Sequence, residues 1–334
     1  MFLEGIIREE IRIKGPLSLS RYMELCLYHP HHGYYMTKNP FEDFITSPEI
    51  SSLFGETIAL CLETIGREQG YEAVSLVELG GGRGLLMEDM ARTFQTLSRP
   101  VSSYHMVEVS PVLKACQQET LKNFPVVWTE NLPAINEGPV LIVANEFFDA
   151  FPVDQYIFTE LGWQERCIDS DLRWVARSTS FSPPSAWPSP KIGDIFEDPV
   201  TVRSYFQSIL DLLKTHGGIF LTVDYGHSHR AYGDTFQALF KHQYVDPLKS
   251  PGEHDLTTHV NFKILFDEAQ EAGFEPLSLL TQGDFLKHYG IQERMGSLLK
   301  MLSPQKQTDL LKALKKLMHS QEMGSLFKVM IIVH

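Results

Sequence analysis

The sequence predicts an α/β fold with a mostly parallel sheet, and three observations support this prediction. An apolar run at Val74–Leu79 breaks into a glycine-rich turn and then a helix-forming segment. Short apolar strands and helical segments alternate from there to residue 144. The run at 140–144 is apolar without a break, as in strands that are buried on both faces. This pattern is typical of a sheet covered by helices on both faces, whose ligand lies beyond the carboxyl ends of the strands.

The chain divides into three predicted regions. Helical patterns interrupted by a polar loop predict an N-terminal helical cap over residues 1–70. The core, with a seven-stranded sheet, is expected at 71–151 and 200–334, and short strands between turn signals predict a β-hairpin insertion over 152–199. The predicted helices include residues 19–28, 85–97, 111–123 and 200–215. The predicted strands cover residues 74–79, 104–109, 126–128, 140–144, 155–159, 163–168, 172–176, 218–226, 274–280 and 327–333.

The turn at residues 80–84 is typical of a nucleotide-binding loop. Gly80, Gly82 and Gly84 fall at every second position, and Glu78 lies two places before the first. Glycine reaches positive φ without a side-chain clash and lets the backbone approach a ligand closely. Dinucleotide loops have the spacing G-x-G-x-x-G instead. The spacing E-x-G-x-G-x-G is that of the loop that holds the amino-acid part of S-adenosylmethionine in Rossmann-like methyltransferases; a tight turn without a ligand is the alternative.

An acidic residue on the next strand favours the ligand over the bare turn. Glu108 ends the apolar run that begins at Tyr104, 24 positions after Gly84. A carboxylate at this point can accept hydrogen bonds from both ribose hydroxyls of an adenosine. Taken alone, Glu108 is more typical of an ordinary charge at a strand end. Together with the glycine loop, it predicts S-adenosylmethionine as cofactor and a Rossmann-like class I methyltransferase fold.

Composition indicates an ordinary globular protein. The chain has 334 residues, of which 43% are hydrophobic and 21% charged. No apolar run approaches the roughly 20 residues that a membrane-spanning helix needs, so no membrane insertion is expected. The helical and acidic pattern of residues 1–10 suits neither a secretory signal nor a transit peptide. We therefore expect a cytoplasmic protein.

Charge and cysteine content argue against several classes of site. The formal charge of −13 argues against a nucleic-acid partner, and an acidic surface suits a cationic partner or serves solubility. The four cysteines are widely spread and form no C-x-x-C pair, so neither zinc nor a disulfide framework is expected. His29, His31 and His32 are more typical of a solvated turn than of a metal site.

Polar residues directly follow the apolar strand at 140–144. In Rossmann-like methyltransferases, the loop after the fourth strand faces the sulfonium and the methyl acceptor. Glu146 is therefore a candidate for orienting an acceptor nitrogen. The alternative is that Asn145 or Asp149 caps the start of a helix.

Several sequence strings outside the glycine loop resemble a known family, the MidA-like S-adenosylmethionine-dependent methyltransferases. The resemblance extends over nearly the whole chain. The strings that carry it are residues 43–51 (DFITSPEIS), 77–84 (VELGGGRG), 107–111 (VEVSP), 145–150 (NEFFDA), 224–227 (DYGH), 244–248 (YVDPL) and 251–260 (PGEHDLTTHV).

The resemblance implies which residues form the cofactor and acceptor sites. The segment 44–49 is expected to close over the cofactor, and the acceptor is expected near Glu146. The implied cofactor-binding residues are Thr46, Ser47, Pro48, Glu49, Glu78, Gly80, Gly82, Gly84, Glu108, Val109, Ser110, Asn131, Leu132 and Asn145. The implied catalytic residues are Glu146, Asp224, Asp255 and His259.

The resemblance also implies a substrate class. The family includes a mitochondrial complex I assembly factor that makes symmetric dimethylarginine on a complex I subunit. We therefore expect a protein substrate with an exposed arginine, with a complex I subunit as a candidate, in a bacterial cytoplasm. A homo-oligomer is compatible with the sequence.

Two positions depart from the family pattern. Gly81 stands where the family usually has proline, which should loosen the turn through extra backbone freedom. The loop at 40–43 is short, with Glu42 where a glycine usually precedes the aspartate, which bears on substrate entry.

Two other functions compete with this interpretation. One is a non-catalytic assembly factor that uses the fold to bind a partner, although the presence of the glycines together with Glu108 disfavours the loss of cofactor binding. The other is an NAD-dependent oxidoreductase, which requires a dinucleotide glycine pattern.

Overall fold

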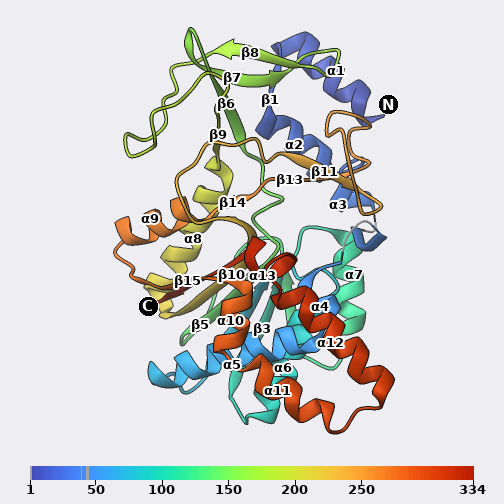
Figure 1. Cartoon of the computed structure of the whole chain (residues 1–334), viewed down its shortest axis with the longest axis vertical. Helices are drawn as coiled ribbons and strands as arrows, with labels where there is room; N and C mark the ends of the chain where they lie inside the picture. The colour runs from blue at the N-terminus through green and yellow to red at the C-terminus, as the bar shows by residue number, and fades with distance from the viewer. Residues whose placement is uncertain (1, 39, 43–44) are drawn as a thin grey trace. The chain divides into compact units, whose positions relative to one another are not determined.

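The computed structural model describes residues 2–38, 40–42 and 45–334 of the chain (Figure 1). The chain forms two compact units. Unit 1 contains Met1–Phe44, Phe148–Gln207 and His229–Ile264, and unit 2 contains Ile45–Phe147, Ser208–Ser228 and Leu265–His334. The domain boundaries expected from sequence near residues 70, 151 and 199 remain a prediction.

A twisted sheet forms the centre of unit 2. The strands that unit 2 contributes to this eight-stranded sheet are β2 (Val74–Leu79), β3 (Val101–Val107), β4 (Val126–Thr129), β5 (Val140–Asn145), β10 (Gly218–His227), β15 (Pro276–Thr281) and β16 (Phe327–Val333). They lie in the order β15-β16-β10-β5-β2-β3-β4. The strands from β10 to β4 pair in parallel, whereas β16 is antiparallel to both of its neighbours. The expected α/β fold is confirmed, with a sheet that is mixed.

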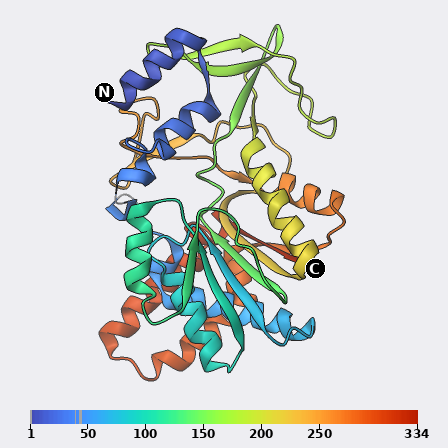
Figure 2. The same ribbon diagram turned by 180° about the vertical axis from the view of Figure 1, so that it is seen from behind.

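Helices cover this sheet. Those of unit 2 are α4 (Ser47–Ile50), α5 (Ser52–Glu68), α6 (Leu85–Thr96), α7 (Pro111–Thr120), α10 (Gln282–His288), α11 (Ile291–Leu299), α12 (Pro304–Met318) and α13 (Met323–Leu326). Apolar side chains at helical spacing on α5 and α6, such as Ile58 and Met90, pack with Leu76 and Leu141 of the sheet. Figure 2 shows these strands and helices from behind. This buried core holds the strand ends in fixed positions.

Unit 1 contains two small antiparallel sheets and the first helices. Strands β1 (Leu17–Ser18), β7 (Gly162–Ile168), β6 (Asp154–Thr159) and β9 (Ile195–Asp198) lie in that order, and β8 (Trp174–Ser178) also pairs with β7. Strands β12 (Gln243–Val245), β11 (Gln237–Phe240) and β13 (Asp255–Thr257) form the second sheet. The remaining elements of unit 1 are α1 (Leu3–Lys14), α2 (Leu19–Tyr28), α3 (Tyr34–Thr37), η1 (Pro40–Glu42) and β14 (Val260–Asn261). The residues of α8 (Val200–His216) and α9 (Phe262–Glu271) are divided between the two units.

The strand expected at 172–176 begins two residues later, at Trp174. The reason is the turn before it: Asp169 Oδ1 accepts hydrogen bonds from the backbone N–H groups of Asp171 and Arg173, at 2.9 and 3.0 Å. These bonds hold residues up to 173 in the turn. The strand therefore starts only after the turn is complete.

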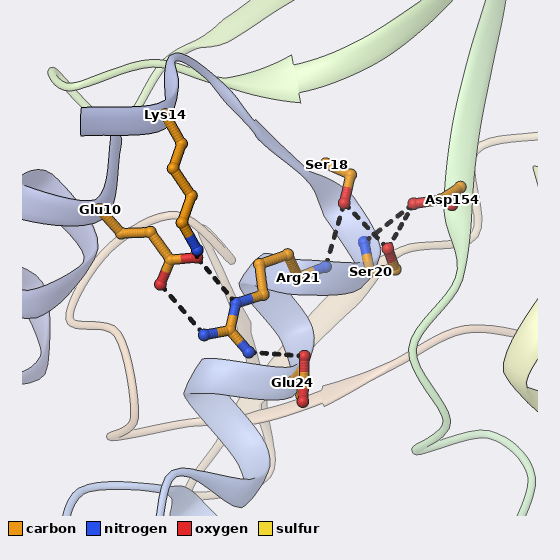
Figure 3. Close-up of polar contacts among 7 residues, drawn as sticks. All are labelled: Glu10, Lys14, Ser18, Ser20, Arg21, Glu24 and Asp154. Atoms are coloured by element: carbon orange, nitrogen blue, oxygen red, sulfur yellow. Dashed lines mark hydrogen bonds and ion pairs between the residues drawn. The ribbon is translucent and has the colours of Figure 1, made fainter. Parts of the chain in front are cut away.

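A polar cluster ties α1, α2 and β6 together within unit 1 (Figure 3). Arg21 of α2 donates to Glu10 of α1, with 3.0 Å between Nε and Oε1, and to Glu24, with 2.8 Å between Nη1 and Oε2. The guanidinium lowers the pKa of the Glu10 carboxyl below its usual value. The hydroxyl of Ser20 donates to Asp154 of β6. These contacts hold α1 and α2 together and join α2 to β6.

Among the described residues, no helix is both long enough and apolar enough to span a membrane.

Candidate active site

Three loops follow strand ends at one edge of the sheet in unit 2, after β2, β3 and β5. Leu79, the last residue of β2, pairs with Val107 on one side and Ala144 on the other. Across β5, Asn145 pairs with Val223 of β10. The glycine loop, Glu108 and Glu146 therefore follow neighbouring strands, as the sequence predicts for a ligand site at this edge. Asp224 lies inside β10, directly after Val223.

The glycine loop needs glycine at the expected positions. Gly80, Gly82 and Gly84 have φ values of 61°, 51° and 82°, in the left-handed region. A Cβ on Gly80 would lie 2.6 Å from Cδ2 of Phe147. Gly84 is the N-cap of α6. Backbone conformation at all three positions and close packing at the first explain the pattern.

Gly81 differs from these three, because its φ is not positive. A Cβ at this position would lie 2.6 Å from Sδ of Met106 and 2.9 Å from the carboxyl carbon of Glu78. Met106 therefore fills the space next to the turn where a larger residue at position 81 would place its side chain. This packing accompanies the departure from proline noted in the sequence.

Glu78 presents a buried carboxyl group beneath the glycine loop. Among the described residues its Oε2 has no hydrogen-bond partner. The pKa of Glu78 is raised to about 8, mainly by burial; the backbone N–H of Met87 opposes the shift, and the nearby carboxylates of Glu108 and Asp89 add to it. Because buried polar atoms are nearly always paired, the free oxygen indicates a ligand that brings a donor.

Glu108 is held by two donors. Its Oε1 accepts the backbone N–H of Ser110 at 2.8 Å, and its Oε2 accepts Nε2 of Gln117 at 2.8 Å. Burial raises the pKa of Glu108, and these hydrogen bonds oppose the shift. The hydroxyl of Ser110 also caps α7 by accepting the N–H of Leu113 at 3.2 Å. The carboxylate is therefore fixed in place at the end of β3.

Gln117 was not among the site residues predicted from the sequence, although its position in the helical pattern could have indicated it. Gln117 is fully buried, four residues after the buried Leu113 on the same helix. A polar residue on the apolar face of a helix needs partners for its amide. Arg83 was also missed: its Nε lies 2.8 Å from Oε1 of Glu49. This ion pair joins the glycine loop to α4.

The segment at 46–49 forms the start of α4. Oε2 of Glu49 accepts the backbone N–H of Thr46 at 3.0 Å and completes a capping box there. The N–H of Ser47 donates to Oε1 of Glu146 at 3.3 Å. Pro48 lies in the first turn. The structure thus places this segment against the loop after β5. Phe44, also expected to contribute here, and Asp43, the first residue of the string at 43–51, lie outside the described residues.

Glu146 adopts a left-handed conformation, with φ of 49°, which is uncommon for a residue with a side chain. Its N–H donates to the carbonyl of Val223 at 2.8 Å, and Nδ2 of Asn145 donates to its Oε1 at 3.2 Å. Oδ1 of Asn145 has no partner among the described residues. Such strain at a strand end is typical of functional sites, where neighbouring contacts maintain it.

The other expected catalytic residues lie in different units. Asp224 in unit 2 is fully buried and accepts the backbone N–H groups of Phe147 and Tyr225, at 3.1 and 2.9 Å. Asp255 and His259 belong to unit 1. There Asp255 accepts the hydroxyl of Tyr35 at 2.8 Å, and the N–H of His259 donates to Thr235 at 2.9 Å. The structure therefore brings Asp224, but not Asp255 or His259, into the same unit as Glu146.

The remaining expected contacts lie at the ends of β3 and β4. Val109 is 45% exposed next to Glu108, so an apolar surface is available there. The carbonyl of Asn131 accepts the hydroxyl of Thr129 at 2.7 Å, and Leu132 is half-buried. In the described part of the chain, no group of three or more His, Cys, Asp and Glu side chains is arranged to hold a metal ion.

Known proteins of similar sequence include methyltransferases. Residues 53–280 match the profile of a family of S-adenosyl-L-methionine-dependent methyltransferases. The chain is 33% identical over 362 residues to the mitochondrial protein arginine methyltransferase NDUFAF7 of Xenopus tropicalis, covering 97% of this chain and 84% of that protein. It is also 33% identical over 355 residues to the human NDUFAF7, covering 95% and 80%.

A solved structure agrees with these relatives. It is a crystal structure of a protein from Burkholderia thailandensis bound to S-adenosyl-homocysteine. The two chains superimpose with a TM-score of 0.85 at 28% identity, over 99% of this chain and 92% of that one.

Proposed function

Because the chain belongs to the S-adenosyl-L-methionine-dependent methyltransferase family, we propose that it methylates an arginine side chain of a protein substrate. Its cofactor is S-adenosyl-L-methionine. The arginine acceptor is supported by relatives that are named protein arginine methyltransferases. These names favour catalysis over the alternative of a non-catalytic assembly factor.

The carboxylate of Glu146 carries the proposal. It lies at the end of β5, in a strained conformation and bonded to the first residue of α4. The next residue, Phe147, packs against Gly80 of the glycine loop. A carboxylate recognises a guanidinium through two parallel hydrogen bonds. Glu146 is thus a carboxylate beside the cofactor loop with the chemistry to hold an arginine.

The cofactor fits the residues at the strand ends. The glycines and the unpartnered oxygen of Glu78 suit the amino-acid part, because an ammonium group brings the donor that this oxygen lacks. Glu108 suits the ribose hydroxyls. When bound, the cofactor supplies an electrophilic methyl group. The further contacts that we assign to cofactor binding come from Thr46, Ser47, Pro48, Glu49, Val109, Ser110, Asn131, Leu132 and Asn145.

The protein's task is to orient the acceptor nitrogen and to manage one proton. Arginine is protonated in water, so a methylated nitrogen must give up a proton. We assign both tasks to Glu146, which orients the guanidinium and accepts the proton. Asp224 supports it by holding the backbone N–H of Phe147, next to Glu146. Asp255 and His259 are further candidates from unit 1.

We extend the proposal to the substrate and the setting. The substrate class is a subunit of respiratory complex I or its bacterial counterpart, with symmetric dimethylarginine as product, in a bacterial cytoplasm. The formal charge of −13 suits a cationic substrate segment. A homo-oligomer is compatible with this function.

A labelling experiment tests the function. The purified protein is incubated with methyl-labelled S-adenosylmethionine and a lysate from a strain that lacks it. We expect one protein band to carry label, and its hydrolysate to contain labelled dimethylarginine. The Glu146→Gln variant serves as the control for contaminating enzymes. Label on lysine or a carboxyl group, or none above that control, contradicts the arginine assignment.

A further inference from the structure

One buried side chain connects two parts of the cofactor site that are distant in sequence. Nε2 of Gln117 donates to Oε2 of Glu108 at 2.8 Å and to the carbonyl oxygen of Gly82 at 3.0 Å. Gln117 is fully buried in α7. A single amide group therefore contacts both the residue at the end of β3 and the glycine loop after β2.

The orientation of this amide is determined by its third contact. Nε1 of Trp128 lies 3.0 Å from Oε1 of Gln117. An indole N–H can only donate, so the facing atom of the glutamine must be its oxygen. The amide nitrogen then has to point at Glu108 and Gly82, both of which present acceptors. Trp128 on β4 thus fixes the direction in which Gln117 donates.

The contacts to Glu108 leave the carboxylate prepared for two further donors. One oxygen accepts the N–H of Ser110 and the other accepts Nε2 of Gln117, so both oxygens of the carboxylate are held. Each carboxylate oxygen can accept a second hydrogen bond. A neutral donor holds the group without the competing positive charge that a lysine or arginine would bring.

We propose that Gln117 is a positioning residue for cofactor recognition. It sets the Glu108 carboxylate to receive the ribose hydroxyls and ties it to the glycine loop through the Gly82 carbonyl. The inference rests on the proposed role of Glu108 in binding the ribose. Gln117 itself acts through Glu108 and Gly82. Its removal should therefore reduce the preference of the protein for a ligand with both ribose hydroxyls over one that lacks a hydroxyl.

The test compares two ligands by isothermal titration of the full-length protein. The first is S-adenosylhomocysteine and the second is its 2′-deoxy analogue, which lacks one donor to Glu108. Hydrogen bonds to charged groups predict that the wild-type protein binds the analogue about 10- to 100-fold more weakly. In Gln117→Leu, we expect both ligands to bind more weakly. We also expect the ratio of their dissociation constants, analogue over S-adenosylhomocysteine, to fall below about threefold. A purely structural role for Gln117 would weaken both ligands equally and leave the ratio unchanged.

A matched control and a second variant accompany the test. Gln118 is the next residue on the same helix and is exposed, so Gln118→Leu should keep the wild-type ratio. Trp128→Phe keeps Gln117 but removes the donor that fixes its amide, and we expect a ratio between those of the wild type and Gln117→Leu. This variant decides the question if Gln117→Leu does not fold.

The outcomes separate the two assignments. If Glu108→Ala keeps the wild-type ratio, the ribose role of Glu108 is wrong. A second outcome is that Glu108→Ala reduces the ratio of the two dissociation constants towards one while Gln117→Leu and Trp128→Phe both keep the wild-type ratio. In that case the positioning role of Gln117 is overturned and the role of Glu108 stands.

Discussion

The ring of Phe147 packs against the α-carbon of Gly80, so closely that a Cβ on the glycine would lie 2.6 Å from Cδ2 of the ring. Gly80 starts the glycine loop after β2, and Phe147 follows Glu146 after β5. This contact joins the proposed cofactor site to the proposed acceptor site. It leaves no space for a side chain at position 80.

We expect Gly80→Ala to lose cofactor binding. Its φ of 61° and the clash with Phe147 together should destabilise the fold by about 1–3 kcal/mol and weaken S-adenosylhomocysteine binding more than tenfold. Gly70→Ala is the matched control, because Gly70 has φ of 75° but no atom within 4 Å of an added Cβ. It should lose about 1 kcal/mol of stability and keep its affinity. Chemical denaturation and titration measure both quantities; wild-type affinity in Gly80→Ala would contradict the prediction.

Gly81 and Met106 should behave as a coupled pair. An added Cβ at position 81 meets Sδ and Cε of Met106 at 2.6 and 2.8 Å, so Gly81→Ala should destabilise the protein by about 1–3 kcal/mol through overpacking. Met106→Val removes both of those atoms. In that background the cost of Gly81→Ala should fall by about 1 kcal/mol, as a double-mutant cycle of unfolding free energies would measure. Strict additivity would show that the two positions do not share this space.

Glu146→Gln should separate cofactor binding from catalysis. The amide oxygen can still accept the N–H of Ser47, but it cannot take a proton or pair with a guanidinium. We expect S-adenosylhomocysteine affinity within about twofold of wild type and kcat lower by about 10²- to 10⁴-fold. Glu130→Gln, at an exposed position after β4, is the control and should keep the wild-type rate. If the Glu146 variant methylates its substrate at that rate too, the assignment of Glu146 is wrong.

The stability of the cofactor-free protein should fall as the pH rises towards 8. The pKa of Glu78 is about 8 in the folded protein against an ordinary value of 4.5, so between these values the folded state holds a proton that the unfolded state has lost. This contribution is complete below pH 4.5 and is lost as the pH rises through about 8. Its size is about 1.4 kcal/mol for each unit of pKa difference.

Glu78→Gln isolates this effect. Position 78 then no longer titrates, so the stability of wild type relative to the variant should fall by about 2 kcal/mol between pH 6 and 8. Asp89, whose burial raises its pKa to about 6, titrates in both proteins, so its own contribution cancels in this difference. Urea denaturation at the two pH values is the measurement. Parallel pH profiles for the two proteins would mean that Glu78 is ionised in the folded state.

Strands that coincide with clear apolar runs were predictable from the sequence. The run at 140–144 became β5 (Val140–Asn145), and the run at 74–79 became β2 with the same bounds. Strands β9 and β12 were not predicted, because short antiparallel strands in polar segments lack a clear alternating pattern. They form because neighbouring strands offer backbone partners. Such pairing is a long-range property.

The sequence by itself determined the α/β class, the cofactor loop and the acidic residue that follows β3. These features depend on residue types at fixed short spacings, and glycine at positive φ or a carboxylate at a strand end has the same meaning in any parallel sheet. Only the tertiary structure decided that Gln117 holds Glu108, that Phe147 covers Gly80 and that Met106 fills the space beside the glycine loop. Those partners come from different strands and helices. Their choice depends on strand register and helix packing, which local periodicity does not encode.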